Sequence, residues 1–224
     1  MNCTGYYFYM LSYLTLLPKY DNCVFRDPQP LDPEAECTAE NICADNSQIL
    51  SHEIDWSDKY SLHNWVEKLD LTCEPGWKIG LIGSMVFVGW VSTLVWLPRI
   101  SDMYGRKWIF FGGMVADWVL FILIFVTKSL NWMIVVTTIF GMMTTIRVNI
   151  GFVYMMEMMP KRKQSFYASL YNTFEGTILL QGTIYFWFIS KDWIYFTLFG
   201  FALQCWNCIA ILFVPESPRW LIEL

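Results

Sequence analysis

This chain of 224 residues lacks the residue combinations that most enzymes need. It has only two histidines, both in one polar segment, and no serine or cysteine with a suitable base near it in the sequence. No glycine-rich loop of the kind that cradles phosphate groups is present. The lysines and arginines form short clusters beside apolar runs instead of one basic surface. The sequence therefore gives no indication of catalysis, of a metal or cofactor, or of nucleic acid as a partner.

Polar residues are also missing from most of the chain. Hydrophobic residues make up 55% of it and aromatic residues 18%, and the mean hydropathy is +0.37. This composition is too apolar for a soluble domain of this length. The polar residues are concentrated in 18–76, whereas nearly everything from Trp77 onward lies in apolar runs of about 20 residues. We therefore expect an all-α integral membrane protein whose first partner is the lipid membrane.

Five apolar blocks are each long enough to cross about 30 Å of hydrocarbon at about 1.5 Å per residue. A sixth, Gly5–Leu17, would reach only about 20 Å. We interpret it as a first transmembrane helix that is clipped at its beginning. The alternative is a signal sequence, but the basic leading region and the cleavage site of small residues are absent. The five full blocks are Ile79–Leu97, Trp108–Thr127, Trp132–Met155, Phe166–Ile189 and Trp193–Val214.

These blocks predict a division of the chain into four parts. Residues 1–17 form the clipped helix 1, residues 18–76 a loop, residues 77–215 the transmembrane helices 2–6, and residues 216–224 the start of a linker. Tryptophans at Trp77, Trp108, Trp132 and Trp193 begin four of these helices, where interfacial anchors are expected.

Positive charge in the short connections predicts the orientation. The connections 98–107 and 157–165 each contain three lysines or arginines, whereas 128–131 and 190–192 contain one lysine each. The positive-inside rule places the first two connections in the cytoplasm. The linker is then cytoplasmic and the long loop lies on the non-cytoplasmic side. We expect the plasma membrane, with an organelle membrane as the alternative.

The long loop is acidic and contains four cysteines. From Lys19 to Gly76 it has 13 acidic residues against four basic ones. In an oxidising compartment an even number of cysteines predicts two disulfides, with three possible pairings, although free thiols remain an alternative. The two histidines lack the spacing that a zinc site with these cysteines would need. The candidate disulfide residues are Cys23, Cys37, Cys43 and Cys73.

Four short motifs flank the apolar blocks. Residues 98–107 read Pro-Arg-Ile-Ser-Asp-Met-Tyr-Gly-Arg-Lys, residues 157–163 read Glu-Met-Met-Pro-Lys-Arg-Lys, and residues 215–221 read Pro-Glu-Ser-Pro-Arg-Trp-Leu. Their order and spacing resemble the organic-ion and sugar transporters of the major facilitator superfamily. Within that superfamily, the long loop with cysteines between helices 1 and 2, ending in the motif at 65–73, resembles the organic cation, anion and carnitine transporters.

The resemblance implies a six-helix bundle corresponding to the N-terminal half of a twelve-helix transporter. It also implies that residues at the cytoplasmic face form a latch between the two halves. Asp102 can approach a helix N-terminus, where a carboxylate is favoured by about 0.3–1 kcal/mol. Glu157 is expected to pair with Arg106 or Arg219. The positions that match these gating motifs are Asp102, Gly105, Arg106, Lys107, Glu157, Pro160, Glu216 and Arg219.

Three charged residues lie inside the predicted membrane helices, where an ionisable group is a functional-site hypothesis. Asp117, Arg147 and Glu175 all lie about 12–14 Å from the cytoplasmic ends of their blocks. Arg147 is therefore expected to pair with Asp117 or Glu175. The pair can be a fixed salt bridge that holds helices together. Alternatively, the carboxylate left unpaired faces a central cavity and attracts a cationic substrate or a coupling proton. Asn149 and Gln181 are further candidates for the lining of the same cavity.

Two functions remain open at this point. The first is secondary transport of small organic ions, by a half-transporter or a fragment of a twelve-helix transporter, with a C-terminal six-helix half as partner. The second is a transport-inactive, transporter-derived structural subunit, with another membrane subunit as partner. Pro98 and Met103 replace a glycine and a basic residue of the family motif, and Thr137 stands where such families often have an arginine. These departures favour the second function, whereas the intact Pro-Glu-Ser-Pro-Arg sequence and the retained Asp117 and Glu175 favour the first. We expect the first function, with the second as the alternative.

Overall fold

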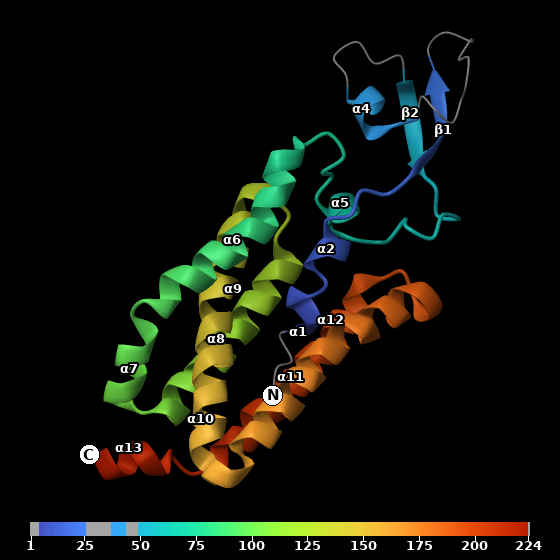
Figure 1. Cartoon of the computed structure of the whole chain (residues 1–224). Helices are drawn as coiled ribbons and strands as arrows, with labels where there is room; N and C mark the ends of the chain where they lie inside the picture. Colours follow the sequence, from blue (N-terminus) through green and yellow to red (C-terminus); the bar gives the residue numbers. More distant parts are fainter. Residues whose placement is uncertain (1–4, 26–36, 44–48, 224) are drawn as a thin grey trace.

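The computed structural model describes residues 5–25, 37–43 and 49–223 of the chain (Figure 1). Two antiparallel strands, β1 (Tyr20–Phe25) and β2 (Ile49–Ile54), stand with the short helix α4 (Ala39–Ile42) at one end of a set of long helices. We call this the loop end. The opposite end, which carries the short helix α13 (Pro218–Glu223), is called the motif end.

Within the described residues, four helices are long and apolar enough to cross a membrane. This finding confirms the prediction of a helical integral membrane protein, to which the fold adds the small sheet of β1 and β2 in the loop. The four helices overlap four of the five predicted blocks. They are α6 (Gly76–Leu94), α8 (Arg106–Val126), the continuous run of α9 (Leu130–Thr145), η1 (Ile146–Ile150) and α10 (Gly151–Met158), and α12 (Trp193–Leu212).

The remaining predicted helices differ from these four. Helix α11 (Lys161–Ile184) and the π-helix η2 (Tyr185–Ile189) form a long rod, but polar residues such as Glu175 make it less apolar than a typical span. The first block contains two short helices, α1 (Gly5–Phe8) and α2 (Leu11–Leu14). A bundle of six transmembrane helices therefore stays a prediction.

The predicted connection after the first full block is itself helical. Helix α6 ends at Leu94, and α7 (Leu97–Tyr104) follows almost directly. Pro98 lies in the first turn of α7. N–H groups in the first turn have no partner within the helix, so the absence of one in proline costs no hydrogen bond, and the fixed φ of proline suits a helix. The proline therefore starts a helix here, and the block ends earlier than its hydropathy suggests.

Two glycines allow α6 and α9 to approach closely. A Cβ added at Gly89 would lie 2.1 Å from the carbonyl oxygen of Thr138, and one at Gly141 would lie 2.1 Å from that of Val86. Small residues commonly permit such backbone contact between membrane helices. A hydroxyl adds to the contact, because Thr145 donates to the carbonyl of Trp90 at 3.3 Å.

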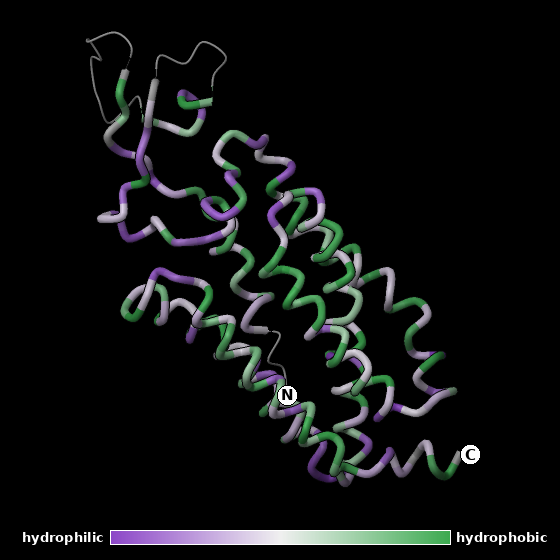
Figure 2. The backbone as a smooth tube through the Cα atoms, turned by 180° about the vertical axis from the view of Figure 1, so that it is seen from behind, coloured by the Kyte–Doolittle hydropathy of each residue, from purple (hydrophilic) through white to green (hydrophobic). Residues whose placement is uncertain are grey.

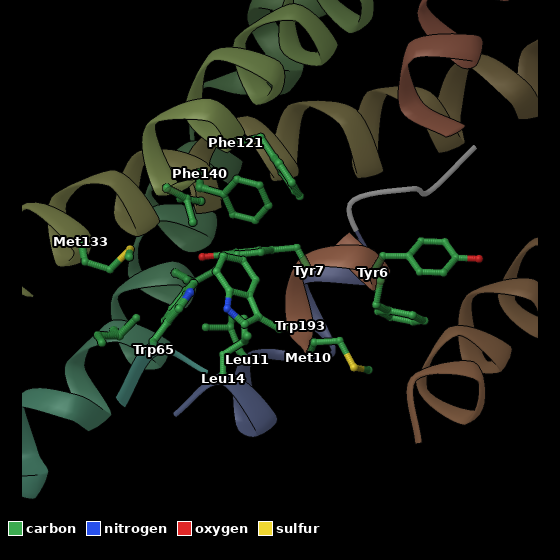
Figure 3. Packing of buried hydrophobic residues seen from close by; sticks show 14 of the residues in the cluster. Tyr6, Tyr7, Met10, Leu11, Leu14, Trp65, Phe121, Met133, Phe140 and Trp193 are labelled. Atoms are coloured by element: carbon green, nitrogen blue, oxygen red, sulfur yellow. The ribbon is translucent and has the colours of Figure 1, made fainter. Parts of the chain in front are cut away.

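The largest buried cluster lies near the loop end and joins the first helix to the bundle (Figure 3). Tyr7 is fully buried, and its ring centroid lies 4.6 Å from that of Phe140, 5.8 Å from Phe121 and 5.7 Å from Trp65. These four rings come from α1, α9, α8 and α5 (Trp65–Lys68). The N-terminal segment is therefore fixed by packing even though its helices are short.

Trp193 also belongs to this cluster, which corrects its predicted role as an interfacial anchor. It is only 4% exposed and stacks on Phe125 at 5.1 Å. The other three tryptophans at block starts are exposed. Figure 2 shows hydrophobic residues along the long helices and hydrophilic ones gathered near both ends, as a lipid-embedded bundle requires.

Candidate functional site

The motif end is built around the N-terminus of α8. Gly105, directly before this helix, has a φ of +88°, a conformation that favours glycine. A Cβ at this position would also lie 3.1 Å from a carboxylate oxygen of Glu216. Glycine at position 105 therefore permits both the sharp turn between α7 and α8 and the approach of Glu216.

Glu216 caps α8. One of its carboxylate oxygens accepts hydrogen bonds from the backbone N–H groups of Arg106 at 3.1 Å and Lys107 at 3.0 Å. The first N–H groups of a helix have no partner within it, and the helix dipole favours an anion there. The structure thus places Glu216, and not Asp102, at this terminus. The carboxylate of Asp102 is 63% exposed and contacts Arg106 at 3.1 Å.

An ion pair joins this terminus to the end of α10. Arg106 pairs with Glu157, and both side chains are nearly buried, at 12% and 10% exposure. The hydroxyl of Ser217 donates to the other oxygen of Glu157 at 2.6 Å, and Tyr154 donates to the carbonyl of Pro215. Residues from three distant stretches of sequence therefore meet at one point.

The other predicted gating residues lie around this cluster. The Nζ of Lys107 donates to the carbonyl of Leu212 at 3.1 Å, and Pro160 precedes the first turn of α11. Arg219 belongs to α13, but its side chain falls outside the described part of the structure. Of the two predicted partners of Glu157, Arg106 is the one that the structure describes.

A second site lies in the middle of the helices, where Arg147 pairs with Asp117. The Nε of Arg147 donates to Oδ2 of Asp117 at 3.1 Å, and the two side chains are 2% and 1% exposed. Asp117 is carried by α8 and Arg147 by the π-helical turn η1. Such turns are rare and often occur at functional sites. The residues of η1 show no pattern that distinguishes this turn from the α-helix on either side of it.

Glu175 lies on the wall of a cavity of about 450 Å³. The phenol groups of Tyr9 and Tyr171 both interact with its carboxylate. Gln181 lines the same cavity and accepts a hydrogen bond from Tyr6 at 2.7 Å. The rest of the wall is mostly aromatic and aliphatic, including Tyr167, Leu170, Phe174, Ile178 and Leu203.

The other two predicted residues lie elsewhere. Arg147 lines a second cavity of about 310 Å³, which shares Met155, Met159 and Tyr171 with the first. Asn149 lines neither, and its amide donates to the carbonyl of Thr145 one turn earlier at 3.2 Å. The structure thus brings Glu175 and Gln181 to one cavity and Arg147 to its neighbour.

Two disulfides tie the loop together. Cys23 bonds to Cys37 and Cys43 to Cys73, which selects one of the three pairings that the sequence allowed and confirms the predicted disulfide bonds. The second bridge links the loop to the residues just before α6. The hydroxyl of Tyr20 in β1 donates to Thr72 at 2.9 Å, which adds a further contact at this junction.

Apolar helices, the Pro-Glu-Ser-Pro-Arg segment whose Glu216 caps α8, and the disulfide-bonded loop are the features that the major facilitator resemblance led us to expect. A family model described as "Sugar (and other) transporter" matches residues 9–224, and the chain belongs to this family. It is therefore an integral membrane protein with a lipid environment.

Its relatives include organic cation carriers. The chain is 29% identical to human solute carrier family 22 member 2 over 169 residues, 70% of this chain and 28% of the relative. It is 32% identical to mouse solute carrier family 22 member 4 over 163 residues, 70% of this chain and 29% of the relative. Human organic cation/carnitine transporter 2 is 28% identical over 174 residues, with 75% and 30% covered. The chain spans less than a third of the length of these relatives.

Proposed function

We propose that this chain forms the N-terminal six-helix half of a secondary transporter for small organic ions, and that it favours cations. The observation that carries the proposal is the carboxylate of Glu175 on the wall of an aromatic cavity. The cavity volume of about 450 Å³ falls within the range of about 300–1,000 Å³ that small-molecule sites occupy. The names of two relatives, the human and rat organic cation/carnitine transporter 2, support the same class of substrate.

The chemistry of the cavity favours a singly charged organic cation. A carboxylate in a water-poor cavity attracts a cation more strongly than it would in bulk water. The faces of Tyr171 and Phe174 can each add a cation–π contact of about 0.5–2 kcal/mol. The alternative role of Glu175 is to carry a coupling proton. Of the five candidate residues for substrate or ion binding, Glu175 and Gln181 line this cavity and Arg147 the neighbouring one, whereas Asp117 pairs with Arg147 and Asn149 bonds within its own helix.

The motif-end cluster supplies a gate for this mechanism. Transporters of this type work by rocking two halves around a site near the bilayer midplane. In our proposal the motif end is cytoplasmic, the disulfide-bonded loop is on the non-cytoplasmic side of the plasma membrane, and a C-terminal six-helix half completes the site. The gate consists of Asp102, Gly105, Arg106, Lys107, Glu157, Pro160, Glu216 and Arg219.

The test is equilibrium binding of tetraethylammonium and of benzoate to the purified chain, followed by uptake in cells that also express a C-terminal half. We expect tetraethylammonium to bind, and Glu175→Gln to weaken it at least about tenfold, or about 1.4 kcal/mol. Glu74→Gln is the matched control, because Glu74 pairs with Lys78 at the surface, far from the cavity in sequence. Equal binding by Glu175→Gln and the original chain, or a preference for benzoate, would contradict the proposal.

The second candidate function is a transport-inactive subunit of a larger membrane complex. One observation favours it: the hydroxyl of Thr137 donates to the carbonyls of Met133 and Ile134 in its own helix, so it does not replace the charge of an arginine. Met103 is 63% exposed and likewise supplies no charge. Native mass spectrometry of gently extracted particles separates the two functions. Co-migration with a homologous six-helix chain supports transport, whereas a large assembly of unrelated proteins supports the subunit.

A further inference from the structure

The short segment 63–68 connects the disulfide-bonded loop to the helices, and we call it the capping segment. It contains α5, which lies beside α2 at the loop end (Figure 1). Trp65 and Val66 are buried in the main cluster, so the segment is fixed in place. Three of its donors, the N–H of His63, the amide of Asn64 and the ammonium of Lys68, donate to backbone carbonyls at the loop-end termini of other elements.

Lys68 caps the C-terminus of α8. Its Nζ donates to the carbonyls of Ile124 and Phe125, both at 2.9 Å. The last carbonyls of a helix have no partner within it, and the helix dipole makes this end negative. The ammonium also lies 5.6 Å from the ring centroid of Trp193. Burial lowers the pKa of Lys68, as expected for a cation that the cluster has partly withdrawn from water.

Asn64 makes the same kind of contact with the first helix. It is 2% exposed, and its Nδ2 donates to the carbonyl of Tyr13 at 3.1 Å and to that of Leu16 at 2.7 Å. The carbonyl of the same side chain accepts from the N–H of Val66 at 3.0 Å and so caps α5. One amide therefore fixes the end of α2 and the start of α5 together.

The third contact reaches the turn between η2 and α12. The backbone N–H of His63 donates to the carbonyl of Lys191 at 3.2 Å. Lys191 makes the reverse contact, because its Nζ donates to the carbonyls of Trp56 at 2.6 Å and Asp58 at 2.7 Å in the loop. The turn and the loop thus exchange hydrogen bonds in both directions.

We propose that the capping segment is a positioning element that joins the loop-end termini of α2, α8 and the η2–α12 turn into one rigid unit. Each of these three helical elements receives at least one hydrogen bond from the capping segment. Three donor residues within six consecutive positions reach all three ends, so loosening one contact should loosen the others. Lys68 and Asn64 are its positioning residues. This inference does not depend on transport.

The test is backbone hydrogen exchange of the full chain, read at residues 13–17, 122–127 and 188–192. Lys68→Met removes the charge and keeps most of the apolar stem. We expect exchange at all three places to rise at least about tenfold, equivalent to about 1.4 kcal/mol. Lys68→Arg should restore protection. Lys78→Met is the matched control, since this lysine makes an ion pair with Glu74 within four residues, and should leave exchange unchanged.

Asn64→Ala tests the same unit by removing the hydrogen bonds to the end of α2. It also replaces Lys68→Met as the test variant if that protein does not fold. We expect it to raise exchange at 122–127 and 188–192 as well as at 13–17. A rise confined to the residues next to the altered side chain, in either variant, would overturn the proposal, because it would show three separate contacts. Failure of cation binding by Glu175 would not affect either outcome.

Discussion

Replacing Arg147 with methionine leaves Asp117 without its ion-pair partner at a position that is 1% exposed. At 3.1 Å and an effective dielectric constant of about 20, the attraction between the two charges is about 5 kcal/mol. Breaking a buried pair on one side typically costs about 3–5 kcal/mol, because the remaining charge stays buried. We expect Arg147→Met to destabilise the helices by about this amount.

The double variant Asp117→Leu with Arg147→Met provides the decisive comparison. Replacing both members of a buried pair by apolar residues is often neutral or stabilising. We therefore expect the double variant to recover most of the stability that either single variant loses. The measurement is thermal unfolding in detergent, with the fraction of protein that remains monodisperse as the readout. It is made for the original chain, both single variants and the double variant, which together form a double-mutant cycle. Additive losses in the double variant, or a loss below about 1 kcal/mol in Arg147→Met, would refute the reasoning.

Three further predictions follow from the packing. Gly141→Ala should lower thermal stability markedly, because the added Cβ would lie 2.1 Å from a carbonyl oxygen. Gly80→Ala is the control and should leave stability nearly unchanged, because nothing lies within 4 Å of its added Cβ. Thermal unfolding curves of the two variants check this prediction. Glu216→Ala should cost about 1–2 kcal/mol through the lost helix cap, and hydrogen exchange at the start of α8 should rise in that variant alone. Cys43→Ser together with Cys73→Ser should leave the helices folded but raise proteolysis of the loop, which gel analysis after brief protease treatment measures.

The membrane helices were predictable because length and hydropathy alone determine them. The same criterion failed where local geometry decides the outcome. Hydropathy continued the first full block to Leu97, but Pro98 starts α7 and α6 ends at Leu94. Trp193 had the sequence position of an interfacial anchor, yet the capping segment and Phe125 cover it. Burial of that residue depends on a loop that is distant in sequence.

The candidate sites were predictable as groups of residues and not as pairs. Equal depth in the membrane made Asp117 and Glu175 equivalent partners for Arg147. Depth along a helix axis says nothing about which helices are neighbours, and the structure places η1 against α8. The same limit applies to Glu216: its motif was recognisable, but only the fold shows that its carboxylate caps α8.

The two caps of α8 have an electrical consequence. A bare helix carries about half an elementary charge at each end, positive at the N-terminus and negative at the C-terminus. Glu216 places a full negative charge at the first end and Lys68 a full positive charge at the second. Each cap therefore opposes the partial charge at its end of α8, so the backbone dipole is compensated at both ends of a helix that is long and apolar enough to cross a membrane.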